Sequence, residues 1–428
     1  MAVDFSQLPG VAAQSVNAPS RLRWAVIVLT LVVAGILMVL ILWPKDEPTQ
    51  TLKFWICLIV FPVGVPVWIV LRRYSAYEGR KLDAALQEEA AQLYNAEVFR
   101  AASLPLAVVG AAVRFSSDPA ENLPARLSQG ALRLETRDAI APGGATIKAR
   151  WFDTPGMHTA AGRFEDDSHR LREMTRWLFN SLQSDLGPLI QALPAHLDLV
   201  VRLSVSNGFS QQENHKLWQE GWQAKSLRKA SSRTEDASLD LMMLDRWLDE
   251  ALAHKAQHAT LLVAAQLHPL VADPPPAGTA EAGAALLLLP EALARDHHVP
   301  VVARLHRPVR GDQDKPLDAL THAMKWSGVA ASQISAGWQT GLDATQAGKL
   351  RAPSMAIGLA VQATDIDQTA GYAGAAAPWL AIACAALSLD VDRAAQMVLV
   401  GEDKHFDCAV LKRARPKGRP DSSALPGD

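Results

Sequence analysis

Two uncharged apolar runs stand near the start of the chain, at residues 24–43 and 54–71. At about 1.5 Å per residue, the first run would cover roughly 30 Å as a helix, which is the thickness of a bilayer core. Trp24 and Trp43 stand at its two ends, where aromatic rings prefer the headgroup level of a membrane. A short polar linker joins the two runs. The pattern therefore predicts a transmembrane helical hairpin over residues 24–71.

The charges that flank the two runs indicate how the hairpin is oriented. The N-terminal segment, residues 1–23, ends with Arg21 and Arg23, and four basic residues follow the second run: Arg72, Arg73, Arg80 and Lys81. Basic residues next to membrane spans stay in the cytoplasm. We therefore expect two passes, with both termini and the soluble body in the cytoplasm. A cleaved signal peptide is the alternative for the first run, but this run is too long and a second run follows directly.

Beyond the hairpin, the apolar positions predict a large body of alternating strands and helices. Residues 72–99 carry apolar side chains at helical spacing and should form a helical neck. Short apolar runs predict strands at 104–115, 131–137, 146–152, 197–205, 260–267, 284–290, 299–306, 354–363 and 396–402. Amphipathic stretches predict helices at 166–193, 236–257, 316–327 and 375–391. This alternation favours a layered α/β domain with strands buried on both faces, and the tail over 414–428 should be disordered.

Composition and charge exclude several classes of protein. The chain has 42 Lys and Arg against 44 Asp and Glu, so nothing attracts it to nucleic acid. Three cysteines are spread along it: Cys57, Cys384 and Cys408. They are too few and too scattered for a disulfide framework or a zinc module. His297, His298 and His306 lack spaced partners for a metal, and without a glycine-rich phosphate-binding motif we expect no cofactor.

Five segments of the body follow one another in an order that is also found in a known enzyme family. They are LPLAVVGAAVRF (104–115), a helix and strand (244–269), a glycine- and alanine-rich strand (278–294), a strand and helix (299–335), and a turn, buried helix and last strands (370–413). This order resembles the β-ketoacyl synthases of the thiolase superfamily. The resemblance implies two related halves, which we place at residues 100–298 and 299–413, each a mixed sheet between helices.

The same resemblance implies that the catalytic residues of a synthase are replaced in this chain. A synthase has a cysteine at the N-terminus of its buried helix, where the helix dipole lowers the pKa of the thiol; here Ala237 or Ser238 stands in that place. Its first histidine lies in a loop resembling HGTGT, which corresponds to SAGWQTGLD and therefore to Gly337 or Trp338. Its second histidine corresponds to Tyr372 in GYAGAAA. We therefore expect no catalytic residue and a fold retained for its shape.

The complete layout, which is a membrane hairpin, a neck and a synthase-like body, resembles the type VI lipase adapter family of Gram-negative secretion loci. The resemblance implies a non-enzymatic adapter in the bacterial inner membrane, which binds a phospholipase effector in the cytoplasm and helps to load it onto the VgrG spike. Two alternatives stay open: an acyl-group enzyme with an atypical nucleophile such as Ser238, and an immunity or structural component of the same locus. An immunity protein against a periplasmic lipase should face the periplasm, and the flanking charges favour the cytoplasm.

One aromatic and basic stretch of the body is our candidate for partner binding. Trp218 and Trp222 are four residues apart and share one face if their segment is helical. Arg228 and Lys229 belong to the basic cluster KSLRKASSR. Tryptophan and arginine are enriched where protein partners bind, so these four residues are our candidate contacts for a partner. Core packing is the default interpretation for the two tryptophans, and a solvated face or loop is the default for the basic cluster.

Overall fold

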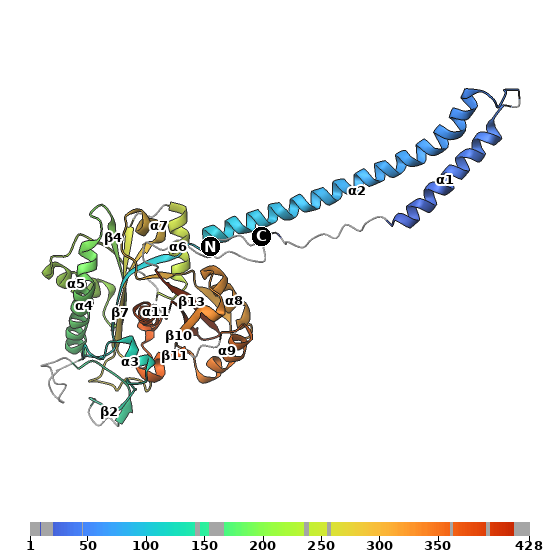
Figure 1. Ribbon diagram of the computed structural model, residues 1–428. Helices are drawn as coiled ribbons and strands as arrows, with labels where there is room; N and C mark the ends of the chain where they lie inside the picture. The colour runs from blue at the N-terminus through green and yellow to red at the C-terminus, as the bar shows by residue number, and fades with distance from the viewer. Residues whose placement is uncertain are drawn as a thin grey trace. The chain divides into compact units, whose positions relative to one another are not determined.

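Two compact units make up the chain in the computed structural model. The described residues are Pro9 and residues 20–44, 46–141, 146–153, 167–234, 239–254, 258–359, 363–390 and 394–414. Of the described residues, those up to Phe99 belong to one unit and those from Arg100 onward belong to the other. The first unit contains two long apolar helices, and the second contains the α/β body (Figure 1).

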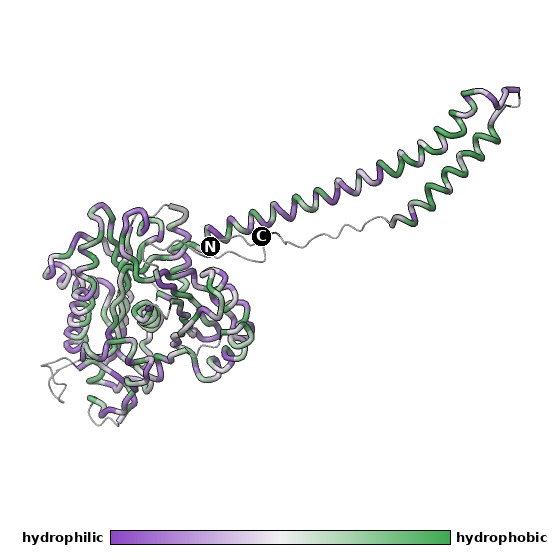
Figure 2. Tube along the Cα trace, in the orientation of Figure 1, coloured by the Kyte–Doolittle hydropathy of each residue, from purple (hydrophilic) through white to green (hydrophobic). Residues whose placement is uncertain are grey.

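The first unit is a hairpin of two helices, α1 (Arg21–Leu42) and α2 (Leu52–Ala102). Both are long and apolar enough to cross a membrane. Figure 2 shows α1 and the beginning of α2 in the green of apolar residues, and the rest of α2 in alternating green and purple. The two expected apolar helices are thus present. The second run and the neck differ from the prediction, because they form one continuous helix that contains Pro62 and Pro66.

The body contains two successive sets of strands and helices. The first set is β1 (Leu106–Arg114), α3 (Pro124–Ser128), β2 (Thr136–Asp138), β3 (Thr146–Lys148), α4 (Asp167–Ala192), β4 (Asp198–Ser206), α5 (Gln211–Ala224), β5 (Ser231–Thr234), α6 (Met243–His254), β6 (His258–Gln266), β7 (Ala282–Pro290) and α7 (Glu291–Asp296). The second set is β8 (Ala303–Leu305), β9 (Val309–Asp312), α8 (Pro316–Ser327), β10 (Ile334–Thr340), α9 (Ala344–Ala356), β11 (Ala363–Asp365), α10 (Ile366–Thr369), α11 (Ala377–Leu387), β12 (Ala395–Glu402) and β13 (His405–Arg413).

The strands of the two sets are connected in the same way. One sheet of 11 strands has the order β11-β10-β12-β13-β8-β1-β7-β6-β4-β5, and β9 pairs with β13. In the first set, β4 is parallel to β5 and β6, whereas β7 is antiparallel to β6 and to β1. In the second set, β10 is parallel to β11 and β12, whereas β13 is antiparallel to β12 and to β8. This shared topology confirms the expected layered α/β body of two related halves.

The two halves meet at one seam and enclose a layer of helix. Strands β1 and β8 pair antiparallel at the seam. Helix α11 contacts β1 and β7 of the first half and β10 and β12 of the second, and Figure 1 shows it between them. Helix α6 has the corresponding place in the first half, and its Trp247 ring stacks on Trp379 of α11, with centroids 6.5 Å apart. Helices α4 and α5 cover the outer face of the first half, and α8 covers that of the second.

Several predicted elements differ from the observed ones. The expected strand over 354–363 is wrong in its first part, because α9 continues to Ala356, and residues 360–362 lie outside the described part. The helix expected over 236–257 begins only at Met243. The strand predicted over 131–137 is reduced to a short pairing that starts at Thr136. The tail beyond residue 414 is outside the described residues.

Candidate functional site

A cavity of about 260 Å³ lies in the body where segments distant in the sequence meet. These segments are the turn before α6, the end of β10, the turn before α11 and the end of β12. The lining residues are Leu239, Asp240, Thr340, Gly341, Tyr372, Gly374, Ala375, Ala377, Pro378, Val400, Gly401 and Glu402. The structure therefore brings together the three regions that the sequence resemblance related to the catalytic residues of a synthase.

The end of β10 is held in place by glycine and by a half-buried carboxylate. Gly341 has a φ of 70°, and a Cβ atom there would stand 2.6 Å from the backbone oxygen of Gly401. Asp367 in α10 accepts hydrogen bonds from the Thr340 hydroxyl and the Gly341 N–H, both at 2.6 Å. Burial raises the pKa of this carboxyl to about 6, against the opposite effect of the two hydrogen bonds. The turn that forms this wall of the cavity is therefore held by two hydrogen bonds and leaves no room for a side chain at residue 341.

Tyr372 occupies the second wall and is held by its backbone. Its N–H donates to the Gly278 carbonyl at 2.8 Å, and its carbonyl accepts from the Ala280 N–H at 2.9 Å. The side chain is 42% exposed. Burial, followed by the charge of Asp367, raises the pKa of the phenol above its usual value. Tyr372 therefore stays protonated at neutral pH and cannot supply the base that an imidazole provides.

One arginine gathers three carboxylates at the edge of the cavity. Arg310 in β9 donates to Asp240 at 3.1 Å, to Glu402 at 2.9 Å and to both oxygens of Asp407, at 2.8 and 2.9 Å. Burial raises the pKa values of Glu402 and Asp407, while Arg310 acts in the opposite direction. Three acidic groups on one guanidinium leave this edge with excess negative charge. A thiolate or another anion would be disfavoured beside it.

The other predicted catalytic positions do not reach the cavity or cannot be placed. Gly337 and Trp338 lie within β10, so the segment predicted as a loop is a strand up to Thr340. Trp338 is buried in the core, and its indole N–H donates to the Gln396 side chain at 2.7 Å. Ala237 and Ser238 lie outside the described residues.

Two thiols and a second tryptophan of the body are fully buried and do not line the cavity. Cys384 and Cys408 are fully buried, and burial raises the pKa of both thiols far above the usual value. Trp379 is also fully buried and donates its indole N–H to the Leu239 carbonyl at 2.9 Å. Trp379 and Cys384 belong to the core between the halves, whereas Cys408 packs in the core beneath α8 on the outer side of the second half. Cys384 thus packs as the small apolar group that its alanine-rich helix predicts.

The predicted partner-binding tryptophans belong to the core. Trp218 and Trp222 both lie on α5, as their spacing predicts, but they are only 2% and 8% exposed. The Trp218 ring meets Phe179 of α4 edge to face at 5.1 Å. The Trp222 N–H donates to the Arg228 carbonyl at 2.9 Å. The interpretation of these two rings as a surface patch is therefore wrong, because the amphipathic face of α5 packs against α4.

The two basic residues of the same candidate patch have different roles. Arg228 is half-buried, and its guanidinium donates to the carbonyls of Leu193, Pro194 and Ala195 at 3.1 to 3.2 Å and to that of Leu197. Arg228 therefore closes the connection between α4 and β4. Lys229 is exposed. Of the four candidate residues, Lys229 is the one that stays available to a partner.

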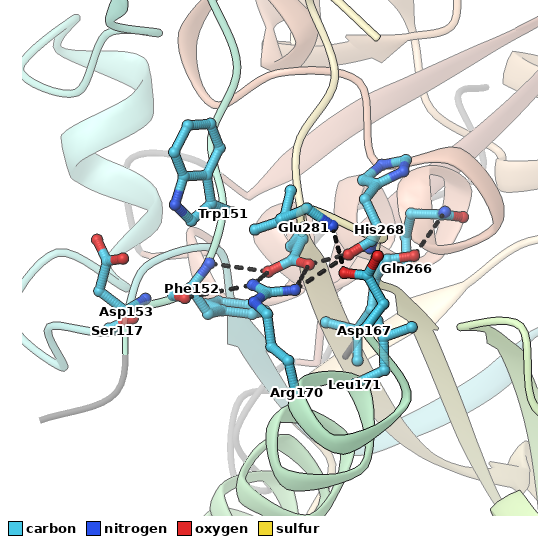
Figure 3. Close-up of polar contacts among 12 residues, drawn as sticks. Ser117, Trp151, Phe152, Asp153, Asp167, Arg170, Leu171, Gln266, His268 and Glu281 are labelled. Carbon is cyan, nitrogen blue, oxygen red and sulfur yellow. Dashed lines mark hydrogen bonds and ion pairs between the residues drawn. The ribbon is translucent and has the colours of Figure 1, made fainter. Parts of the chain in front are cut away.

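The sequence pattern did not reveal a buried ion pair at the N-terminal end of α4, which is the end opposite to the one that Arg228 contacts (Figure 3). Arg170 of α4 and Glu281, just before β7, are fully buried and joined by two contacts of 2.8 and 2.9 Å. Glu281 also accepts the backbone N–H groups of Phe152 and His268, both at 2.9 Å. The pair ties α4 to two segments that follow β3 and β6. A single arginine in a polar helix turn gives no sequence signal of such a role.

Comparison with solved structures shows a thiolase- and ketosynthase-like fold. Ketosynthase twelve of the bacillaene polyketide synthase from Bacillus amyloliquefaciens aligns with a TM-score of 0.50 and 11% identity, over 74% of this chain and 76% of that one. The dimeric peroxisomal thiolase of Saccharomyces cerevisiae aligns with a TM-score of 0.43 and 8% identity, over 73% of this chain and 98% of that one. No protein-family model and no curated protein matches the chain.

Proposed function

We propose that the protein is a non-enzymatic adapter in the bacterial inner membrane. It binds a phospholipase effector in the cytoplasm and helps to load it onto the VgrG spike of a type VI secretion system. The lining of the cavity supports the non-enzymatic part of this proposal. In the described part of the chain, the polar side chains that line it are Asp240, Thr340, Tyr372 and Glu402, with neither a cysteine nor a histidine.

That lining does not suit the chemistry for which this fold is known. Acyl transfer on a cysteine needs a thiolate, together with groups that accept and return a proton near neutral pH. The carboxylates around Arg310 oppose an anionic nucleophile, and the two buried thiols of the body stay protonated. A retained fold with such a cavity supports a role in binding. It is the combination of this body with a membrane hairpin that favours an adapter.

The hairpin supports the membrane part of the proposal. Helices α1 and α2 have the length and composition of membrane spans. The basic residues in the first turn of α1, Arg21 and Arg23, and those after the apolar part of α2 favour the cytoplasmic side for both ends. A body on that side meets a newly made effector before secretion. Two uncharged spans supply anchoring, so recognition of a soluble cargo belongs to the body.

The exposed part of the basic cluster is our proposed contact for the cargo. Lys229 and Arg233 are both exposed. Basic side chains at the rim of an interface speed association with an acidic partner and make the rate depend on salt. The tryptophans of α5 no longer belong to this surface.

Affinity purification of the tagged full-length chain from its native host, in detergent and followed by mass spectrometry, tests the proposal. We expect a phospholipase and VgrG to be recovered with the wild type and with Lys404→Glu, which reverses an exposed charge elsewhere on the body. Lys229→Glu should recover less of the effector than the wild type does, and this difference should grow as salt is lowered. Recovery of neither protein with the wild type would contradict the adapter function.

The enzymatic alternative has its own test. The full-length chain is incubated with acyl-thioesters, and both product release and covalent acylation are measured by mass spectrometry. We expect neither. An acyl group captured on the wild type but absent from Ser238→Ala would instead establish an enzyme with a serine nucleophile.

A further inference from the structure

A groove of about 760 Å³ lies between α1 and α2 in the first unit. The two helices approach each other at Gly35 and Pro62, where a Cβ atom on Gly35 would stand 3.0 Å from the Pro62 Cβ. Small residues allow such a close approach of membrane helices. The groove begins on the side of this contact that leads to the basic flanks. Its volume falls within the range of protein sites for small ligands.

The lining of the groove changes from apolar to basic along the helices. Val28 and Val32 of α1 and Val70 of α2 line its apolar part, and Arg73 and Lys81 of α2 line its other end. Lys81 comes eight positions after Arg73, so the two side chains stand about 12 Å apart along the axis and about 80° apart around it, and both line the groove. The change occurs where the uncharged run of α2 ends. The groove therefore crosses from the hydrocarbon region to the headgroup region of a bilayer.

The charges at the polar end suit one negative headgroup. Arg73 and Lys81 are cationic, and Glu78, which also lines the groove, is anionic. Their sum is one positive charge. Guanidinium and ammonium groups both bind phosphate well, and Trp24 and Tyr77 supply the aromatic side chains typical of this depth. A phospholipid has the same sequence of chemistry, with apolar chains followed by a phosphate.

We propose that this groove binds one anionic glycerophospholipid of the cytoplasmic leaflet. Its phosphate contacts Arg73 and Lys81, and its acyl chains lie against Val28, Val32 and Val70. The lipid fills the space that the two helices leave open beyond their contact at Gly35. This inference rests on the membrane insertion that belongs to the proposed function.

Native mass spectrometry of the full-length chain in detergent, titrated with phosphatidylglycerol or phosphatidylcholine, tests the site. The wild type should hold one phosphatidylglycerol with a preference of roughly ten- to thirtyfold over phosphatidylcholine. The variant Arg73→Gln/Lys81→Gln should lose this preference. Arg72→Gln/Arg80→Gln removes the same charge from side chains that do not line the groove, and Arg72 instead lies over the Trp68 ring. It should keep the preference.

Two outcomes would overturn the inference. One is an unchanged preference in Arg73→Gln/Lys81→Gln. The other is an equal loss in both double variants, which would indicate unspecific attraction to the basic segment. Carbonate extraction of membranes separates this failure from that of the proposed function. If carbonate removes the wild-type chain from the membrane, the chain is not inserted and the proposed function fails. If the chain stays in the membrane but shows no lipid preference, only the proposed lipid site fails.

Discussion

Arg170 and Glu281 show how single side chains can hold the body together. Each would carry a charge into a region without water, and each is compensated by the other and by backbone groups. An ion pair of this kind adds little net stability compared with apolar packing, but the loss of one partner leaves an uncompensated buried charge. Its value is therefore in the specific arrangement of α4 and the segments beside it.

Replacement of Glu281 should be far more damaging than replacement of an exposed glutamate. Glu281→Gln should lower the free energy of unfolding by about 3–5 kcal/mol. Glu173→Gln breaks a partly exposed ion pair with Arg176 on the same helix as Arg170, and it should cost less than about 1 kcal/mol. Urea unfolding of the full-length chain in detergent measures both. Equal effects of the two substitutions would contradict a structural role for the buried pair.

Asp367 should make the stability of the body depend on pH. Its pKa is raised from 3.8 to about 6 by burial, so the folded chain binds this proton more tightly than the unfolded chain. The resulting stabilisation is complete below about pH 4 and is lost as the pH rises through about 6. Asp367→Asn does not titrate, so the wild type should lose up to about 3 kcal/mol relative to it between pH 4 and pH 7. Urea unfolding across this range measures the difference, and a constant difference would contradict the assignment.

At the scale of helices and strands, the sequence predicted the bounds of an element correctly where residues typical of helix ends mark them. Helix α8 covers 316–327 as predicted, because Pro316 starts it and Gly328, with a left-handed backbone, ends it. Helix α5 was expected only conditionally, although its capping box between Ser210 and Glu213 gives a start signal. The run over 354–363 has small apolar residues that suit either a helix or a strand, and periodicity alone cannot separate the two.

Arg228 and its neighbour Lys229 should respond differently to the same substitution. Arg228→Ala removes the bonds to the carbonyls between α4 and β4 and should lower the free energy of unfolding by about 2–3 kcal/mol. Lys229→Ala removes an exposed side chain and should stay within about 0.5 kcal/mol. Urea unfolding of both full-length variants tests this. If the two variants unfold alike, the guanidinium does not hold this connection, and Arg228 returns to the candidate contact surface.

At the scale of the whole molecule, the sequence resemblance predicted the two halves, but the contacts across the sheet came only from the structure. The three segments around the cavity were identified by their order in the chain. The acidic edge was not, because Arg310 reaches Asp407 only through the register of β9 against β13. Trp338 was placed near the site because a strand end was mistaken for a loop. Residues that meet through strand pairing leave no local pattern in the sequence.

The orientation of the hairpin decides whether the body can meet a cytoplasmic cargo. Arg72, Arg73, Arg80 and Lys81 should hold the end of the second span in the cytoplasm. A green fluorescent reporter fused after Asp428 of the full chain should therefore fluoresce, and alkaline phosphatase at the same position should be inactive. As a control, replacing those four basic residues with glutamine and adding four lysines to the linker after α1 should reverse both signals. Phosphatase activity from the wild-type fusion would contradict the orientation and, with it, the adapter function.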